Sequence, residues 1–217
     1  MLDSKQTMDV EALYRAVLKG ARETFEAVQR DHSEETFYGF AFGTDCEALS
    51  FFAMANTEEG LARAAEDYAG NGSGDDLGLQ RTVLRWSLWD WAYVFGEEDA
   101  RFSDVHRILR ESQDILLGAM EEEAFEAIKQ VYATYIKVLR QLDSDGIFSS
   151  AEHRANIGLF ITTNDCSIEE TMAWTSQVNP EGVARRIENE LEADGAAYRA
   201  LLSARKAPKG SKLSLLE

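Results

Sequence analysis

Apolar residues at helical spacing open the chain. From Val10 to Phe25 they recur every three or four positions, which predicts an amphipathic helix. Asp9 stands where an N-cap is expected, and Glu11 places a negative charge in the first turn. We expect the polar stretch 29–35 to end this helix.

Two strand-like runs follow, Phe37–Thr44 and Ala48–Asn56, joined by the short polar link 45–47, which is the size of a hairpin turn. Large and small residues alternate along the first run: Tyr38, Phe40 and Phe42 against Gly39, Ala41 and Gly43. The pattern predicts one bulky face and one face small enough for a close neighbour.

Thr57 is expected to cap a helix that runs to about Ala69. The stretch Gly70–Gly78 reads GNGSGDDLG and is interpreted as a flexible loop or joint. It follows a helix rather than a strand, so it does not match a phosphate-binding loop.

A tryptophan-rich element comes next. The pattern predicts that Leu84–Trp86 completes a strand, and that Ser87, with Asp90 three residues later, caps a helix carrying Trp91 and Phe95. Aromatic residues at this density form either core or a surface that a partner contacts.

Apolar periodicity predicts helices over 105–116 and 125–142, separated or bent at Gly118. Asp143–Gly146 reads as a turn, because Arg154 occupies the place of the last acidic ligand of a calcium loop. A late strand, Ile157–Thr163, precedes two further helices, one capped by Ser167 with Glu170 and one opened by Pro180.

These elements predict an α+β fold with a mostly antiparallel sheet of about four strands and helices packed against it. We expect one domain over residues 1–203, with a possible joint at 70–78. Residues 204–217 are expected to form a basic, disordered tail.

Net charge changes this picture most. The 217 residues carry a formal charge of −17, and the tail is itself basic, so the rest of the chain is still more acidic. Such a chain repels nucleic acid and anionic membrane surfaces, and a basic protein is the partner that its charge favours. The alternative interpretation is a charge that serves solubility alone.

The start of the chain shows no secretory signal, and no apolar run is long enough to cross a membrane, so a cytoplasmic location is expected. Cys46 and Cys166 are far apart in sequence and belong to no CxxC pair. We expect both thiols to be reduced and partly buried.

No catalytic, metal or cofactor motif is found in the sequence. His32, His106 and His153 form no HExxH pattern, and there is no GxSxG turn for a serine nucleophile. Cys46 and Cys166 each follow an aspartate, whose like charge would raise the pKa of a thiol. The expectation is therefore a protein that is not an enzyme and binds no cofactor or metal.

Acidic clusters and one tryptophan are the candidate contacts to a partner. Helix-starting acids such as Glu58 are explained by the helix dipole, whereas several others are not. They form either a solvated face or a surface that attracts a basic partner. The candidate residues are Asp75, Asp76, Glu97, Glu98, Asp99, Glu121, Glu122, Glu123 and Trp89.

Three segments resemble a bacterial family known as domain of unknown function four-three-zero-three. They are the run 37–45, Arg85–Ser87 with Trp91, and the stretch 161–180. Leu88-Trp89 departs from the family pattern, in which Pro and a small residue are expected after the serine. The resemblance implies a cytoplasmic bacterial domain without assigned catalysis, similar to the immunity proteins that accompany toxins.

Three functional hypotheses remain. The first is an immunity-type protein that neutralises a basic toxin domain by binding it. The second is an enzyme or small-ligand-binding protein with a pocket between Trp86–Trp91 and the late strand near Asp165, into which Arg85 or His106 would converge. The third is a scaffold in which an edge strand of the 37–56 hairpin pairs between chains.

Overall fold

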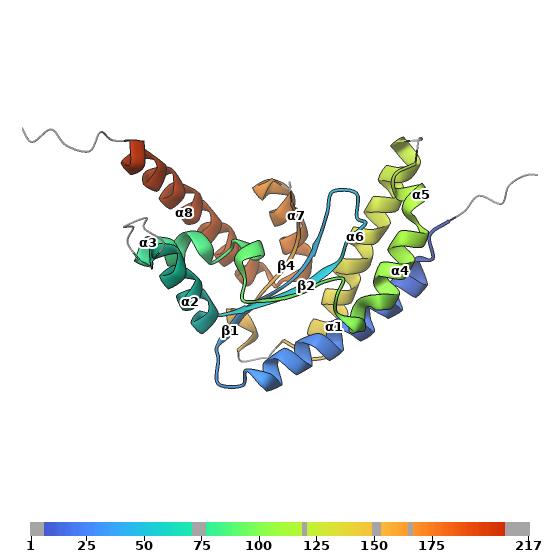
Figure 1. Cartoon of the computed structure of the whole chain (residues 1–217), viewed down its shortest axis with the longest axis horizontal. Helices are drawn as coiled ribbons and strands as arrows, with labels where there is room; N and C mark the ends of the chain where they lie inside the picture. Colours follow the sequence, from blue (N-terminus) through green and yellow to red (C-terminus); the bar gives the residue numbers. More distant parts are fainter. Residues whose placement is uncertain (1–6, 71–76, 119–120, 149–152, 165–166, 207–217) are drawn as a thin grey trace, which may run out of the picture.

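A four-stranded sheet covered by helices on both faces forms the protein (Figure 1). The computed structural model describes residues 7–70, 77–118, 121–148, 153–164 and 167–206. The predicted joint at 70–78 and the predicted tail therefore lie largely outside the described residues.

The strands are β1 (Phe37–Thr44), β2 (Phe52–Thr57), β3 (Tyr93–Phe95) and β4 (Gly158–Thr163). They lie in the order β3-β2-β1-β4, with antiparallel pairs β1–β2 and β2–β3 and a parallel pair β1–β4. The predicted α+β class is confirmed, with a mixed sheet. Both hairpin strands are central, so the scaffold hypothesis is wrong in assigning either of them a free edge.

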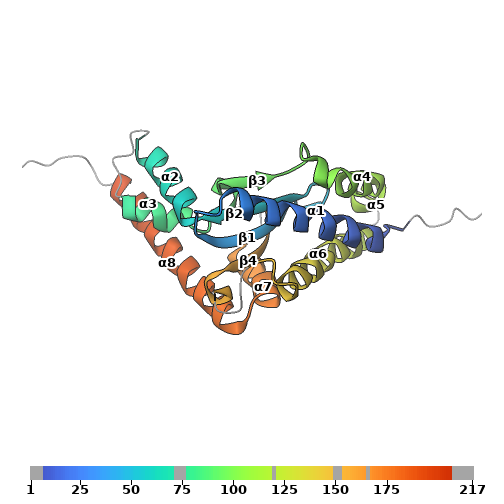
Figure 2. The ribbon, with the colours of Figure 1, turned by 90° about the horizontal axis from the view of Figure 1, so that it is seen from below.

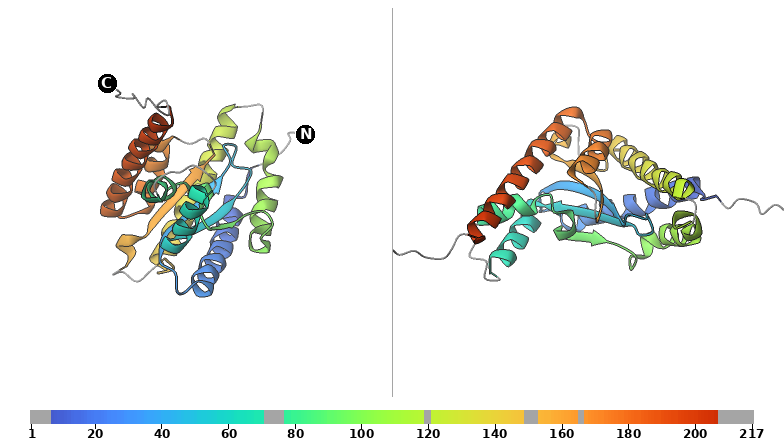
Figure 3. Two further views of the ribbon diagram at one scale, coloured as in Figure 1. Left: turned by 60° about the vertical axis from the view of Figure 1, so that its left-hand side comes forward. Right: turned by 90° about the horizontal axis from the view of Figure 1, so that it is seen from above.

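Helices divide between the two faces of the sheet (Figures 2 and 3). One core contains residues of α1 (Val10–Asp31), α4 (Ser103–Glu111), α5 (Gln113–Leu116) and α6 (Glu121–Ser144). The other contains residues of α2 (Glu58–Tyr68), α3 (Leu77–Leu84) and α8 (Glu181–Lys206). The helix α7 (Ile168–Val178) packs against β4. Because each central strand is covered twice, β1 is buried along nearly its whole length.

The alternation in β1 is confirmed for most positions. Phe40 and Phe42 face the α1–α6 core, whereas Ala41 belongs to the other core. The prediction is wrong for Tyr38, because an irregularity in the pairing between Phe37 and Gly39 accompanies its placement in the opposite core.

The small face of β1 does receive close neighbours, among them two tryptophans. A Cβ atom added at Gly39 would lie 2.5 Å from the Trp91 ring. One added at Gly43 would lie 2.5 Å from Met54 and 3.1 Å from Trp89. The glycines therefore allow the Trp89–Trp91 segment to lie directly on the sheet.

The predicted course of the tryptophan-rich element is wrong. Leu84 ends helix α3 instead of a strand, and a short 3₁₀ helix, Leu88–Asp90, leads into β3 where a helix was expected. Ser87 and Asp90 do contact each other, but the serine hydroxyl bonds to the carboxylate at 2.5 Å and caps no backbone N–H. Burial of Trp91 on Gly39 holds this segment extended.

The β1–β2 link is longer than predicted, because Ser50 and the residues before it fold back on the end of β1. Thr44 Oγ1 donates to the Ser50 carbonyl at 2.6 Å, and Asp45 accepts from the Leu49 N–H at 2.8 Å. Ala48 takes a positive φ of 57° within this loop. A three-residue turn could not provide these contacts.

Several local predictions are confirmed. Asp9 and Thr57 cap α1 and α2, and Ser167 with Glu170 forms a complete capping box on α7. The turn after α6 contains Gly146 at a φ of +75°. Arg154, which excludes a calcium loop there, forms an ion pair with Asp143.

Candidate functional site

A polar pocket of about 550 Å³ opens beside the start of β1. It lies between that strand, α2, the end of α3, the segment before β4, and α8. Its lining residues are Thr36, Phe37, Tyr38, Glu58, Thr82, Arg85, Asn156, Arg186, Glu190, Ala193 and Asp194. Charged side chains from sequence-distant segments therefore converge on one cavity, as they do in many binding sites.

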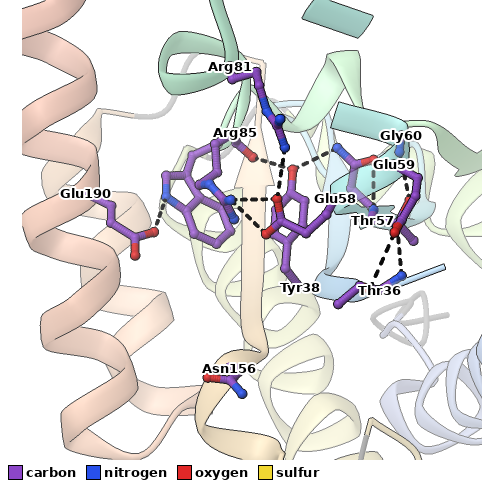
Figure 4. A network of polar contacts seen from close by, with 12 residues as sticks. Thr36, Tyr38, Thr57, Glu58, Glu59, Gly60, Arg81, Arg85, Asn156 and Glu190 are labelled. Carbon is purple, nitrogen blue, oxygen red and sulfur yellow. Dashed lines mark hydrogen bonds and ion pairs between the residues drawn. The ribbon is translucent and has the colours of Figure 1, made fainter. Parts of the chain in front are cut away.

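Tyr38 and Arg85 form one side of the pocket (Figure 4). The guanidinium carbon of Arg85 lies 4.5 Å from the centre of the Tyr38 ring, and its Nη2 donates to both carboxylate oxygens of Glu58, at 2.7 and 2.8 Å. The Tyr38 hydroxyl accepts from Asn56 at 2.8 Å and donates to the Arg85 carbonyl at 2.9 Å. Burial raises the pKa of Tyr38, so this hydroxyl stays protonated.

Helix α8 forms the opposite side. Trp86 Nε1 donates to Glu190 at 2.9 Å, and Arg186 donates to the Asn156 carbonyl at 3.2 Å. Two buried polar atoms here have no hydrogen-bond partner within the described chain: Arg186 Nε and Asp194 Oδ2. Burial, reinforced by the nearby Glu190 carboxylate and opposed by Arg85, raises the pKa of Asp194 to about 7.

The predicted pocket at the tryptophan-rich element is small. A cavity of about 210 Å³ lies between Trp86–Trp89 and β4, and the side chains that line it carry no charge. Arg85 lines the larger pocket instead, whereas His106 is buried on helix α4. Asp165 lies outside the described residues. The small-ligand hypothesis stays a prediction: the cavity that it named is present but small, and Arg85 lines a different pocket.

The predicted partner-contacting residues fall into two separate groups. Asp75 and Asp76 lie outside the described residues, as does the side chain of Glu121. Glu122 is exposed and Glu123 is half-buried at the start of α6. Helices α4 and α5 lie in the chain between the acids that follow β3 and these two glutamates.

The second group lies at the β3 end of the sheet. Trp89 is 41% exposed, and its ring stacks edge-on against Phe52, with centroids 5.3 Å apart. Phe52 also lies 2.7 Å from the place of a Cβ on Gly96. The exposed Glu97 and Glu98 follow directly. Trp89 and Gly96, the residue before this acidic segment, thus both lie close to Phe52.

Asp99 differs from these neighbours because it is held internally. Its carboxylate accepts from the backbone N–H of Arg101 at 3.0 Å and from the guanidinium Nε of the same residue at 2.8 Å. The side-chain hydrogen bond from Arg101 keeps the pKa of Asp99 below its usual value. Asp99 is therefore less available to a partner than Glu97 or Glu98.

A hydrogen-bond network around the buried Glu35 was not predicted from the sequence. Glu35 is only 10% exposed and accepts hydrogen bonds from Thr57 at 2.5 Å, Arg63 at 2.9 Å and Tyr93 at 2.7 Å. Burial alone would raise the pKa of Glu35, but these three bonds lower it to about 2. No pattern in the sequence indicates it, because its partners come from β2, α2 and β3.

Metal-type ligands and cysteines form no cluster among the described residues. Among the described residues no three metal-type ligands gather into a site. Cys46 is exposed rather than partly buried, and Cys166 lies outside the described residues. Within the described ranges, no helix combines the length and apolar character that crossing a bilayer requires.

Comparisons with known proteins identify the chain at the level of family. A family model described as "Domain of unknown function (DUF4303)" matches residues 17–180. Neither a curated protein nor a solved structure matches the chain. The matched range includes Tyr38, Arg85 and Trp89 but ends at the residue before α8.

Proposed function

This chain belongs to the DUF4303 family, and we propose that it is an acidic protein-binding domain whose partner is a basic protein. Its binding surface is the exposed Trp89 ring together with Glu97 and Glu98 at the β3 end of the sheet. We call these three residues the Trp89 surface.

Charge supports the proposal. The sequence holds 39 acidic side chains and 22 lysines and arginines, so even complete pairing of every cation would leave 17 acids without a counter-charge. The net charge of −17 is therefore carried by acids that the chain's own lysines and arginines cannot neutralise. Such a surface accelerates the approach of a basic protein at low salt.

The single observation that carries the proposal is the position of Trp89. A large aromatic side chain that is 41% exposed costs hydration free energy, and tryptophan is prominent among residues that dominate binding energy. Phe52 and Gly43 support its ring from below, which fixes its orientation before a partner arrives. Glu97 and Glu98 supply complementary charge beside it.

The partner that we propose is a toxin domain, which makes the chain an immunity protein. A toxin that acts on nucleic acid presents a basic groove, and an acidic domain covering that groove blocks it. The excess of acids over lysines and arginines supports this partner class. Catalysis by the bound chain is not needed.

The test uses the full chain and the candidate toxin domain encoded beside its gene. We expect a complex at low salt, and we expect Trp89→Ala to weaken it at least about tenfold, as an interface hot spot would. Glu188→Gln, an exposed acid on α8, is the matched control and should bind as the wild type does. Absence of a complex at low salt, or full binding by Trp89→Ala, contradicts the proposal.

A further inference from the structure

The pocket beside the start of β1 has a chemistry that the proposed function does not use. It lies near Tyr38, whereas the Trp89 surface lies near Gly43 at the other end of the same strand. We propose that this pocket binds a small ligand with a protonated amine at one end and a carboxylate or carbonyl at the other. The amine contacts Glu190 and Asp194, and the acceptor contacts Arg186.

The amine end follows from charge. Glu190 and Asp194 are four residues apart on α8, so both carboxylates lie on the same face of the helix. Arg85, the cation on the opposite side, is already bonded to both oxygens of Glu58. Among the described lining residues, Arg186 is then the one cation left to balance two carboxylates, and an ammonium group would supply the missing positive charge.

A buried acceptor points to the same end. Asp194 Oδ2 is shielded from solvent and receives no hydrogen bond from the described residues. Buried polar atoms in folded proteins nearly always have a partner, so an empty acceptor inside a pocket marks a place for a donor. An ammonium N–H provides that donor and prefers the ionised carboxylate.

The other end follows from Arg186. Its Nε is also buried and finds no acceptor among the described residues, although its Nη2 bonds to the Asn156 carbonyl. Arg186 precedes Asp194 by eight residues, or about 12 Å along the helix axis. The empty donor and the empty acceptor are therefore well separated, and a ligand that satisfies both needs a spacer.

The cavity accommodates such a molecule. Its volume of about 550 Å³ falls within the usual range of small-molecule pockets, roughly 300–1,000 Å³. Phe37, Thr82 and Ala193 contribute less polar lining between the charged groups. Three carboxylates against two guanidinium groups disfavour a ligand that is only anionic.

The experiment compares three probes of similar length on the full chain by titration calorimetry at pH 7. They are ε-aminocaproate with both end groups, hexylamine with the amine alone, and caproate with the carboxylate alone. We expect ε-aminocaproate to bind most tightly, hexylamine more weakly and caproate least. Asp194→Asn should weaken ε-aminocaproate at least tenfold, whereas Glu192→Gln, an exposed acid on the same helix, should not.

Two further readouts separate binding from a merely structural role. Arg186→Met should reduce the affinity for ε-aminocaproate without reducing that for hexylamine. Binding should also release protons and strengthen from pH 6 to pH 8, because the amine favours ionised Asp194. The charged groups around that carboxylate are Glu190 and Arg186 on α8, Arg85 after α3, and Glu58 on α2.

Caproate binding as tightly as ε-aminocaproate would overturn the inference. So would undetectable binding of both amines at millimolar concentration, or equal affinity in wild type and Asp194→Asn. Trp89→Ala should leave ε-aminocaproate binding unchanged. The ligand titration and the toxin-binding test can therefore fail independently of each other.

Discussion

The indole Nε1 of Trp86 donates a 2.9 Å hydrogen bond to Glu190 Oε2, across 104 residues of sequence (Figure 4). This bond joins the tryptophan-rich element to helix α8 on the same face of the sheet. It also fixes one carboxylate of the polar pocket four residues from Asp194. The position of the Glu190 carboxylate in the pocket thus depends on Trp86, which lies far from it in the sequence.

Neutralising Glu190 should lower the pKa of Asp194. Glu190→Gln keeps a side-chain oxygen for Trp86 Nε1 but removes the negative charge that disfavours ionisation of Asp194. A carboxyl NMR titration of Asp194 in the variant should therefore give a pKa below the wild-type value of about 7. An unchanged titration would show that the two carboxylates do not interact.

Asp194→Asn should stabilise the fold at alkaline pH. The pKa of Asp194 is raised from 3.8 to about 7, so the folded state favours the protonated form, and stability is lost as pH rises through 7. The neutral variant avoids that loss. Chemical unfolding should show a gain of roughly 1 to 2 kcal/mol at pH 8, discounted for solvent screening, and little difference at pH 4. A gain that is largest at pH 4 would contradict this assignment.

Glu35→Gln should show the opposite dependence on pH. The pKa of Glu35 is lowered from 4.5 to about 2, so its ionised form contributes stability above pH 4.5 and loses it as pH falls toward 2. We expect the variant to be about 1 to 2 kcal/mol less stable at pH 7, with a smaller gap at pH 3. Urea unfolding at the two pH values measures both. The exposed Glu34→Gln is the control and should change neither.

Gly39→Ala should destabilise the protein by about 1 to 3 kcal/mol, because its Cβ would lie 2.5 Å from the buried Trp91 ring. Gly182→Ala, near the start of α8, meets no atom within 4 Å and should be neutral or slightly stabilising. Thermal unfolding of both variants provides the comparison. Equal stability of Gly39→Ala and wild type would mean that Trp91 does not lie on β1 as described.

The sequence predicted elements whose signals are local. Asp9, Thr57 and Ser167 each carry their own capping contact within three residues, and helices began where these residues stood. The alternation in β1 likewise predicted a face of small residues, because a glycine inside a strand, as at positions 39 and 43, often marks a place where another group packs closely.

Long-range packing decided what the sequence could not predict. Trp91 lies on Gly39 and bonds to the Arg85 carbonyl, so the segment before β3 is extended although its residues fit a capped helix. The pocket could not be predicted for the same reason, because its lining residues come from distant parts of the sequence. Glu190 and Asp194 occupy polar positions on an ordinary helix. Residues from distant segments, such as Tyr38, Arg85 and Asn156, complete the cavity that they share.

If the negative charge around Trp89 attracts a basic protein, the association rate depends on salt and on Glu97 and Glu98. We would measure association of the full chain with its candidate toxin domain at low and high salt, for wild type and for the Glu97→Gln, Glu98→Gln double variant. We expect a wild-type rate that falls steeply as salt rises, and a slower, less salt-dependent rate for the variant. Equal rates for the two proteins at low salt would contradict it.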